Sequence, residues 1–171
     1  QFAKENSAGK VDEGQIESVA SWALKPFEND TSSNGDNPFQ IQSGLQEMMQ
    51  ELVGIARSEE GMTRAIEEIH QLRERSDRVS ATGNREYNPG WHTALDLHAL
   101  LTVSEAIAFA ALERKASIGA HSRDDYPDKA EPGVPKYNTV VRKDADGTMQ
   151  VGREAIPEIR ADLQQIIEEM K

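Results

Sequence analysis

The sequence predicts a mainly α fold: a helical bundle of three to four main helices, followed by a C-terminal β-hairpin and a final helix. Two observations predict it. Apolar residues recur at helical spacing in four long segments that end before residue 117. After Pro135 the pattern changes to alternating, β-branched residues on both sides of Asp146-Gly147, a pair typical of hairpin turns. We therefore expect a disordered segment or linker at 1–10, the bundle at 11–129 and the hairpin with its terminal helix at 130–171.

The first three helices follow from their apolar spacing and their capping residues. The first is expected to run from about Val11 to Phe27 with Asp12 as N-cap, and a loop rich in turn formers follows at 28–38. The second begins near Pro38 or Phe39, and Ser58 is expected to cap the third. The apolar positions of the second and third helices are Ile41, Leu45, Met48, Met49, Leu52, Val53, Ile55, Met62, Ala65, Ile66, Ile69, Leu72 and, further on, Val79.

The fourth helix, about Trp91 to Ala116, is the longest. Its leucines and alanines make it apolar nearly all round, which is typical of a helix buried among others, and we expect it to be the hub of the bundle. Core packing is also the default expectation for the Met48-Met49 pair and for Trp22 and Trp91, with an interface as the alternative for the tryptophans. The final helix is expected within 156–170.

Composition excludes several classes of function. The formal net charge of -11 disfavours sequence-independent binding to nucleic acid or direct adsorption to anionic lipid. Cysteine is absent, so disulfides and thiolate chemistry are excluded. No unbroken run of about 18 apolar residues predicts a membrane span. The N-terminus lacks the pattern of a signal peptide and is expected to be the middle of a longer chain.

Candidate chemical sites are sparse. His92 and Asp96 share one helical face and could belong to a metal site, but two ligands do not make one, and a local hydrogen bond is the favoured interpretation. The segment from Asp144 is weakly similar to a calcium loop, yet its twelfth position is Ala155 and not glutamate, which favours a hairpin turn. The sequence predicts no metal site.

His121 with Asp124 or Asp125 has the composition of an acid–base couple, and a hydrogen-bonded polar loop is the favoured alternative. The sequence has no glycine-rich phosphate loop and no serine elbow. We therefore expect no catalytic, cofactor-binding or metal-binding residue in this chain.

Three stretches carry a resemblance to a known family. The segment LERKASIGAHSRDDYPD, from Leu112, is similar to the Arg-x-Glu-Ser-Arg-Gly-x-His-x-Arg-x-Asp-x-Pro segment of succinate dehydrogenase/fumarate reductase flavoproteins, which follows an Ala-rich helix near the C-terminus. LQEMMQELVGIARSEEGM (45–62) and AIEEIHQLRER (65–75) resemble the preceding parts in the same order. The family's Glu-Ser-Arg is here Ala116, Ser117 and Ile118, so two charged partners are missing. Aspartate oxidases and adenylylsulfate reductases have related C-terminal domains, which leaves the subfamily open. A stand-alone helical interaction module is the other alternative.

The resemblance implies a C-terminal structural domain whose parent binds FAD and interconverts succinate and fumarate by hydride transfer. It implies packing on the parent's own FAD-binding domain, an iron–sulfur subunit as partner, and a cytoplasmic location peripheral to the membrane through partner subunits. This chain alone is expected to be catalytically inactive. We expect the polar loop to dock on the missing domain, and the candidates for that docking are Arg114, His121, Arg123 and Asp125.

Overall fold

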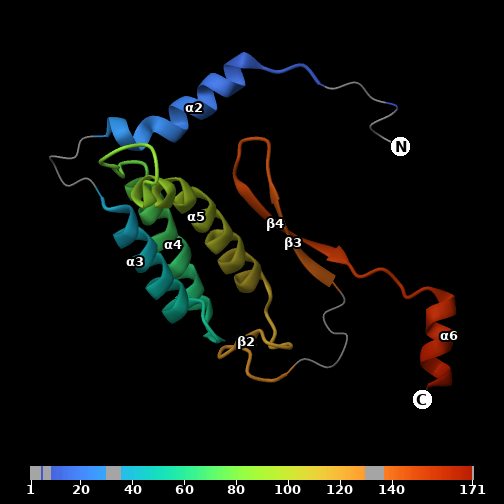
Figure 1. Cartoon of the computed structure of the whole chain (residues 1–171). Coiled ribbons are helices and arrows are strands. Elements are labelled where there is room, and N and C mark those ends of the chain that lie inside the picture. The colour runs from blue at the N-terminus through green and yellow to red at the C-terminus, as the bar shows by residue number, and fades with distance from the viewer. Residues whose placement is uncertain (1–4, 6–8, 30–35, 130–136, 171) are drawn as a thin grey trace. The chain divides into compact units, whose positions relative to one another are not determined.

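The computed structural model describes residues 5, 9–29, 36–129 and 137–170 (Figure 1). The linker expected at 1–10 therefore lies mostly outside the described residues. The chain divides into two compact units, which are treated separately: Gln1–Leu45 with Gln71–Leu101, and Gln46–His70 with Thr102–Lys171. The sequence-based division at residue 130 stays a prediction.

The first described helix is α2, Glu13–Glu28, and it confirms the predicted N-cap. The carboxylate of Asp12 accepts a hydrogen bond from the backbone N–H of Gln15 at 3.2 Å, which satisfies a donor that the first turn leaves free. Asn29 follows the helix, and its side-chain amide donates to the carbonyl of Val79 at 2.7 Å. This bond fixes the end of α2 within its unit.

The three long helices are α3 (Pro38–Leu52), α4 (Glu59–Ser76) and α5 (Pro89–Glu113), and each contributes residues to both units. Ser58 caps α4 as predicted, since its hydroxyl accepts from the backbone N–H of Gly61 at 3.1 Å. Helix α3 ends at Leu52 and does not reach the apolar Ile55, which is 82 % exposed. Helix α5 is shifted toward the N-terminus from the predicted bounds.

The apolar positions expected for the second and third helices are mostly buried, whereas Val11, Ile16, Val19 and Trp22 of the first are exposed. In the first unit the buried apolar residues are Ile41, Leu45, Leu72, Val79, Ala81, Leu97 and Leu101, and in the second they are Met48, Val53, Met62, Ala65, Ile66, Ile69, Ala108 and Ala111. Within each unit most of these residues come from segments of α3, α4 and α5 that lie side by side, whereas Val53, Val79 and Ala81 follow the ends of α3 and α4 (Figure 1). The helical periodicity therefore identified the core of both units.

Helix α5 departs from the expectation of a helix buried all round. Val103 is 58 % exposed and Ile107 is 46 % exposed, although Ala108 and Ala111 on the same helix are buried. The expectation was wrong for this chain because a helix that is apolar on several faces needs neighbours on each of them. The described residues cover only one side of α5.

Among the described residues, α5 is also the one helix that is long and apolar enough to cross a membrane by length and composition, with a mean hydropathy of 1.5 and 22 % of the apolar window buried. A core helix passes the same test, so this finding alone does not place α5 in a membrane. The sequence argument missed it because it looked for an unbroken apolar run, and the hydropathy average tolerates the interspersed His, Asp and Thr residues.

The predicted hairpin is confirmed. Strand β3 (Tyr137–Lys143) pairs antiparallel with β4 (Met149–Ala155), with Val141 opposite Val151. In the turn, Gly147 has φ +90°, which glycine adopts at no steric cost. The carboxylate of Asp146 accepts from the N–H of Thr148 at 2.9 Å, and these Thr148 bonds lower the pKa of Asp146. The turn interpretation of Asp144 to Gly147 is thus correct.

The last described element is α6, Ala161–Glu169, which is shorter than the predicted helix. Its apolar residues are all exposed, at Leu163, Ile166 and Ile167. The cap position, Arg160, forms no side-chain capping bond, and this missing start signal accounts for the shorter helix.

The N-cap of α5 gives a first testable prediction. The side chain of Asn88 accepts from the N–H of Trp91 at 2.9 Å and donates to the carbonyls of Thr82 and Asn84. We expect Asn88→Ala to lower the free energy of unfolding by about 1–2 kcal/mol, measured by urea denaturation. Asn84→Ala is the matched control in the same loop, because Asn84 contributes its carbonyl and keeps it. Equal losses in both variants would contradict the capping role.

Candidate functional site

The polar loop after α5 is held by a short parallel strand pair. Strand β2 (Ser122–Arg123) pairs with β1 (Ala56–Arg57), and the N–H of Asp124 donates to the carbonyl of Arg57 at 2.8 Å. The chain turns back between Ile118 and His121, which exchange two backbone hydrogen bonds of 2.9 and 3.0 Å. Gly119 lies in this turn at φ +59°, a conformation that favours glycine. The turn delivers His121 and Arg123 to the strand pair.

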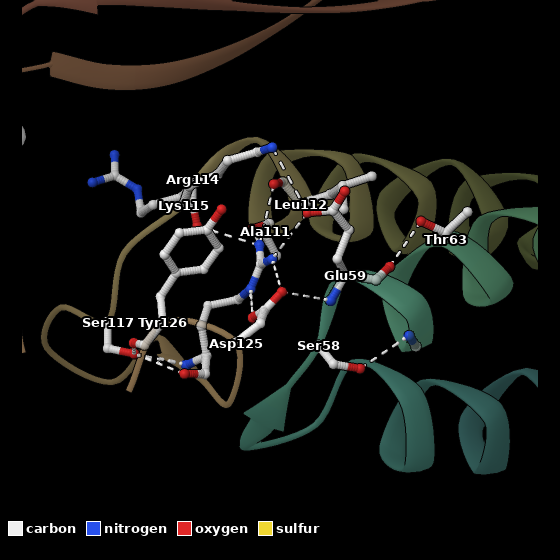
Figure 2. Close-up of polar contacts among 12 residues, drawn as sticks. Ser58, Glu59, Thr63, Ala111, Leu112, Arg114, Lys115, Ser117, Asp125 and Tyr126 are labelled. Carbon is white, nitrogen blue, oxygen red and sulfur yellow. Dashed lines mark hydrogen bonds and ion pairs between the residues drawn. The ribbon is translucent and has the colours of Figure 1, made fainter. Parts of the chain in front are cut away.

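Arg123 closes the C-terminal end of α5. Its side chain is 0 % exposed, and its Nη1 donates to the carbonyls of Ala111 at 3.3 Å and Leu112 at 3.2 Å (Figure 2). The last carbonyls of a helix have no partner within the helix and carry its partial negative charge. A buried cation at this place therefore both satisfies the carbonyls and complements the helix dipole.

Asp125 balances this cation and reaches a second helix. Its carboxylate accepts from Nε of Arg123 at 2.7 Å and also from Nη2. The same carboxylate accepts from the backbone N–H of Glu59, in the first turn of α4, at 3.0 Å (Figure 2). The bond with Arg123 holds the pKa of Asp125 far below its usual value, and the Glu59 bond adds to this. The Arg123–Asp125 pair thus connects the end of α5 to the start of α4.

Ser117 and Tyr126 complete the surroundings of Arg123. The hydroxyl of Ser117, which is buried, accepts from the N–H of Arg123 at 2.8 Å and donates to the carbonyl of Tyr126 at 2.6 Å. The Arg123 guanidinium lies 5.1 Å from the centre of the Tyr126 ring, within the range of a cation–π contact. Across the described residues, every buried side-chain nitrogen and oxygen has a hydrogen-bond partner.

A second arginine makes a parallel connection to α3. Arg57 donates through Nε to the carbonyls of Val53 at 3.1 Å and Gly54 at 2.9 Å, just after α3 ends. Its Nη1 lies 2.7 Å from Nδ1 of His121, and Nε2 of His121 lies 3.2 Å from the carbonyl of Arg114. Because arginine donates and a carbonyl accepts, Nδ1 is the acceptor and Nε2 carries the hydrogen. His121 therefore joins the ends of α3 and α5 as a neutral imidazole.

The environment of His121 favours this neutral form. Burial is the main cause that lowers its pKa, and the positive charges of Arg57, Arg123 and Arg114 lower it further. The hydrogen bond to the Arg114 carbonyl opposes these effects in part.

Arg114 attaches the hairpin to the same end of α5. Its Nη2 donates to the carbonyl of Tyr137 and to the hydroxyl of Thr139, both at 3.3 Å, and its guanidinium lies 5.4 Å from the Tyr137 ring. Arg153 lies 4.7 Å from that ring and donates to Glu113 at 2.6 Å. Tyr137 is thus contacted by two guanidinium groups.

The four docking candidates from the sequence, Arg114, His121, Arg123 and Asp125, all belong to this one network. Their contact with another domain stays a prediction. The specific partners differ from the expected ones, since Arg123 and Asp125 bind each other and two helix ends, and the Arg123 side chain has no exposed surface of its own. Both ring nitrogens of His121 are engaged by Arg57 and Arg114, which leaves the acid–base interpretation without support.

Two participants escaped the sequence analysis. Arg57 lies 64 positions before His121 and Glu59 lies 66 positions before Asp125, and only the capping signal of Ser58 pointed to their neighbourhood. His92 lies with its ring 5.6 Å from that of Trp91. Nowhere in the described part of the chain do three or more His, Asp or Glu residues form a group able to hold a metal ion.

The network of Arg57, Arg114, Ser117, His121, Arg123 and Asp125, called the clamp below, joins the ends of α3 and α5 to the start of α4. Its arginines donate to a carboxylate, to backbone carbonyls or to a hydroxyl, and both nitrogens of its imidazole are hydrogen-bonded. A dinucleotide cofactor needs a glycine-rich turn between a strand and a helix, and the sequence has none. The arrangement fits a part of a protein that supports a fold or an interface.

The comparisons with known proteins agree with this interpretation. The family model for the C-terminal region of fumarate reductase flavoproteins matches residues 42–158, more than half of the chain. A curated fumarate reductase flavoprotein subunit from Mycobacterium tuberculosis is 32% identical over 119 residues, which are 69% of this chain and 20% of that protein. A succinate dehydrogenase flavoprotein subunit from Coxiella burnetii is 33% identical over 64% of this chain and 19% of its own length.

A solved structure and a related oxidase extend the comparison. The structure of Mycobacterium smegmatis Sdh1 in complex with UQ1 superposes with a TM-score of 0.83 at 34% identity, covering 93% of this chain and 27% of that one. An L-aspartate oxidase from Yersinia pestis is 32% identical over 66% of this chain and 21% of its own length.

The fold and the clamp define a mainly α domain with a C-terminal hairpin. The chain belongs to the family of fumarate reductase flavoprotein C-terminal domains. It spans about a fifth of the length of the curated relatives that it matches.

Proposed function

We propose that this chain is the structural C-terminal domain of a longer flavoprotein that interconverts succinate and fumarate with FAD. The observation that carries the proposal is the family match, which runs through α4, α5, the clamp and the hairpin. The chain's own residues provide helices and a clamp, so the flavin and the hydride transfer belong to the remaining part of the parent. The isolated chain is expected to be inactive.

The exposed side of α5 supports a role in packing. Val103 and Ile107, one helical turn apart, present large apolar side chains at 58 % and 46 % exposure. Exposed apolar area costs roughly 25 cal/mol per Å², so a partner that covers this side gains free energy. We propose that the parent's own FAD-binding domain covers it, because the relatives are about five times longer than the matched region.

The parent's partners follow from the same proposal. We infer an iron–sulfur subunit as the electron acceptor, and a cytoplasmic location peripheral to the membrane through partner subunits. The solved relative is described in complex with UQ1, which supports electron transfer to quinone in the parent. No binding to nucleic acid is proposed, since the net charge of -11 opposes it.

A second candidate parent is an L-aspartate oxidase. The Yersinia pestis enzyme is about as similar to this chain as the fumarate reductases are, at 32% identity. The helical domain does not separate the two activities, because the substrate would be bound by parts of the parent that lie outside this chain.

One assay separates the candidates. We would express this chain and the complete gene product that contains it, and measure flavin absorbance and dye reduction with succinate or aspartate. A yellow, succinate-oxidising complete protein beside a colourless fragment supports the proposal. Activity with aspartate alone supports the oxidase. A complete protein without flavin would refute both.

If this side of α5 packs on another domain, Ile107→Asp should affect the complete protein but not the 171-residue chain. In the complete protein, Ile107→Asp would place a charge against the covering domain, at a cost of at least about 2 kcal/mol. We therefore expect a more than tenfold loss of correctly docked, flavin-retaining protein, measured by flavin content after gel filtration. In the 171-residue chain, where Ile107 is already exposed, the same change should leave the melting temperature unchanged.

The conservative variant Ile107→Val is the control. It keeps an apolar side chain at this place, and flavin content should stay at the wild-type level. Full flavin retention by Ile107→Asp would show that this side of α5 is not the packing surface.

A further inference from the structure

His121 lies where three cationic side chains converge. Arg57 approaches from β1, Arg123 belongs to β2 next to it, and Arg114 lies just beyond α5. The carboxylates of Asp125 and Glu59 are close to this group, but both are directed to Arg123. The two ring nitrogens of His121 are bonded to Arg57 and to the Arg114 carbonyl, so neither nitrogen is bonded to a carboxylate.

The hydrogen-bond geometry permits only one protonation state. Nδ1 must accept from the Arg57 guanidinium at 2.7 Å, and Nε2 must donate to the Arg114 carbonyl at 3.2 Å. A second proton would sit on Nδ1 and point at an N–H of Arg57. The result would be two donors facing each other and two like charges in contact, and arginine cannot relieve this by losing its own proton.

We propose that His121 makes the clamp acid-sensitive: a second proton at Nδ1 expels the Arg57 guanidinium and separates β1 from β2. Within the described part of the chain, only Arg57 joins the carbonyls of Val53 and Gly54 to the imidazole of His121. Its departure releases the end of α3 from the end of α5. The Arg123–Asp125 pair meets this tie only at the Arg114 carbonyl, to which Nη1 of Arg123 also donates at 3.5 Å. It keeps α4 joined to α5 through the bond from the N–H of Glu59 to Asp125.

The direction of the pH effect follows from linkage. Burial and the three arginines lower the pKa of His121 in the folded protein below its value of about 6.5 in the unfolded chain. The unfolded state then binds the proton first, so the stabilising effect of the tie is complete above pH 6.5 and is lost as the pH falls through the folded-state pKa. The lowered pKa of Asp125 places its own titration in a much more acidic range.

The test uses the complete gene product and two readouts by mass spectrometry. Deuterium exchange at the imidazole C2–H gives the pKa of each histidine, and amide exchange reports opening of the peptides that contain Arg57 and Asp124. We expect a pKa for His121 below 6.5. Below that pH, opening at the Asp124 amide should increase about tenfold per unit, corrected for intrinsic exchange, until the folded-state pKa is passed.

His121→Gln provides a neutral substitute. The glutamine carbonyl can accept from Arg57 and its amide can donate to the Arg114 carbonyl, but it does not titrate. In this variant the opening of both peptides should no longer depend on pH between 6.5 and the folded-state pKa. His92→Gln is the matched control on α5, and it should keep the full pH dependence.

Two results would overturn the proposal. One is a His121 pKa at or above 6.5, which the wild-type protein reveals even if the glutamine variant does not fold. The other is an unchanged pH-dependent opening in His121→Gln, which would assign the effect to another group.

Discussion

Replacing Arg123 by alanine is expected to lower the free energy of unfolding of this chain by about 3 kcal/mol, the scale for breaking a buried ion pair from one side. The guanidinium is fully buried and joins Asp125 to the last carbonyls of α5. Its removal leaves those carbonyls without a donor and leaves the Asp125 carboxylate, whose side chain is 31% exposed, without its counterion. Urea denaturation of the chain measures the loss.

Two comparisons make this expectation specific. Arg142 forms an ion pair with Glu154 on the hairpin, but its side chain is 70% exposed, so Arg142→Ala should cost at most about 1 kcal/mol. Arg123→Lys should fall between the two, because one ammonium can hold Asp125 but lacks the fork that also reaches the Ala111 and Leu112 carbonyls. If the Arg123 and Arg142 alanine variants lost equal stability, the clamp would be an ordinary surface contact.

A double-mutant cycle with Asp125→Asn tests how the clamp is built. The asparagine keeps an acceptor for the N–H of Glu59 but removes the charge that opposes Arg123. Since the two residues share one network, their losses should not add, and the interaction energy should exceed about 0.5 kcal/mol. Additive losses would mean that Arg123 acts on the carbonyls of α5 independently of Asp125.

The bundle was predictable because its signals are local. Ser58 and Asp12 are single residues that indicate where a helix begins, and Ile41, Leu45 and Met48 recur at helical spacing on one face of a helix. The hairpin was equally accessible, since Asp146-Gly147 specifies its turn. Each of these features is encoded within a few consecutive positions, which is the range that periodicity and capping rules cover.

Only one of the two segments that form the clamp could be predicted from the sequence. The loop from Arg114 to Asp125 stood out by its density of polar groups, but its partner segment did not, because strands of two residues such as β1 leave no pattern in a sequence. The pairing of Arg57 with His121 joins residues 64 positions apart, and no local sequence pattern distinguishes Arg57 from the other arginines. Local rules therefore found the loop but not its partners within the same chain. The contact of the loop with another domain stays a prediction.

The misjudged burial of α5 has a different cause. Sequence reports how apolar a helix is, and burial depends on what surrounds it. Leu101 and Val103 are both apolar and two positions apart, yet Leu101 is 0% exposed and Val103 is 58% exposed. A rule that predicts a buried helix from apolar composition assumes neighbours on every apolar face, and this chain matches about a fifth of its relatives' length.

This pair of residues gives the second large expected effect. Leu101→Ala should destabilise the 171-residue chain by about 3 kcal/mol, from lost transfer energy and the cavity that remains. Val103→Ala on the same helix should change it by less than about 0.5 kcal/mol, because most of its side chain already contacts solvent. Thermal and urea unfolding of both variants gives the two values.

In the complete protein, the cost of Val103→Ala should differ from its cost in this chain, whereas the cost of Leu101→Ala should be the same. If another domain covers this side of α5, Val103→Ala removes buried methyl groups there and should cost about 1–2 kcal/mol. The difference between its cost in the complete protein and in the chain then measures the burial that the covering domain provides at this residue. A difference of zero would mean that Val103 stays in solvent throughout, and the apolar character of α5 would need another explanation.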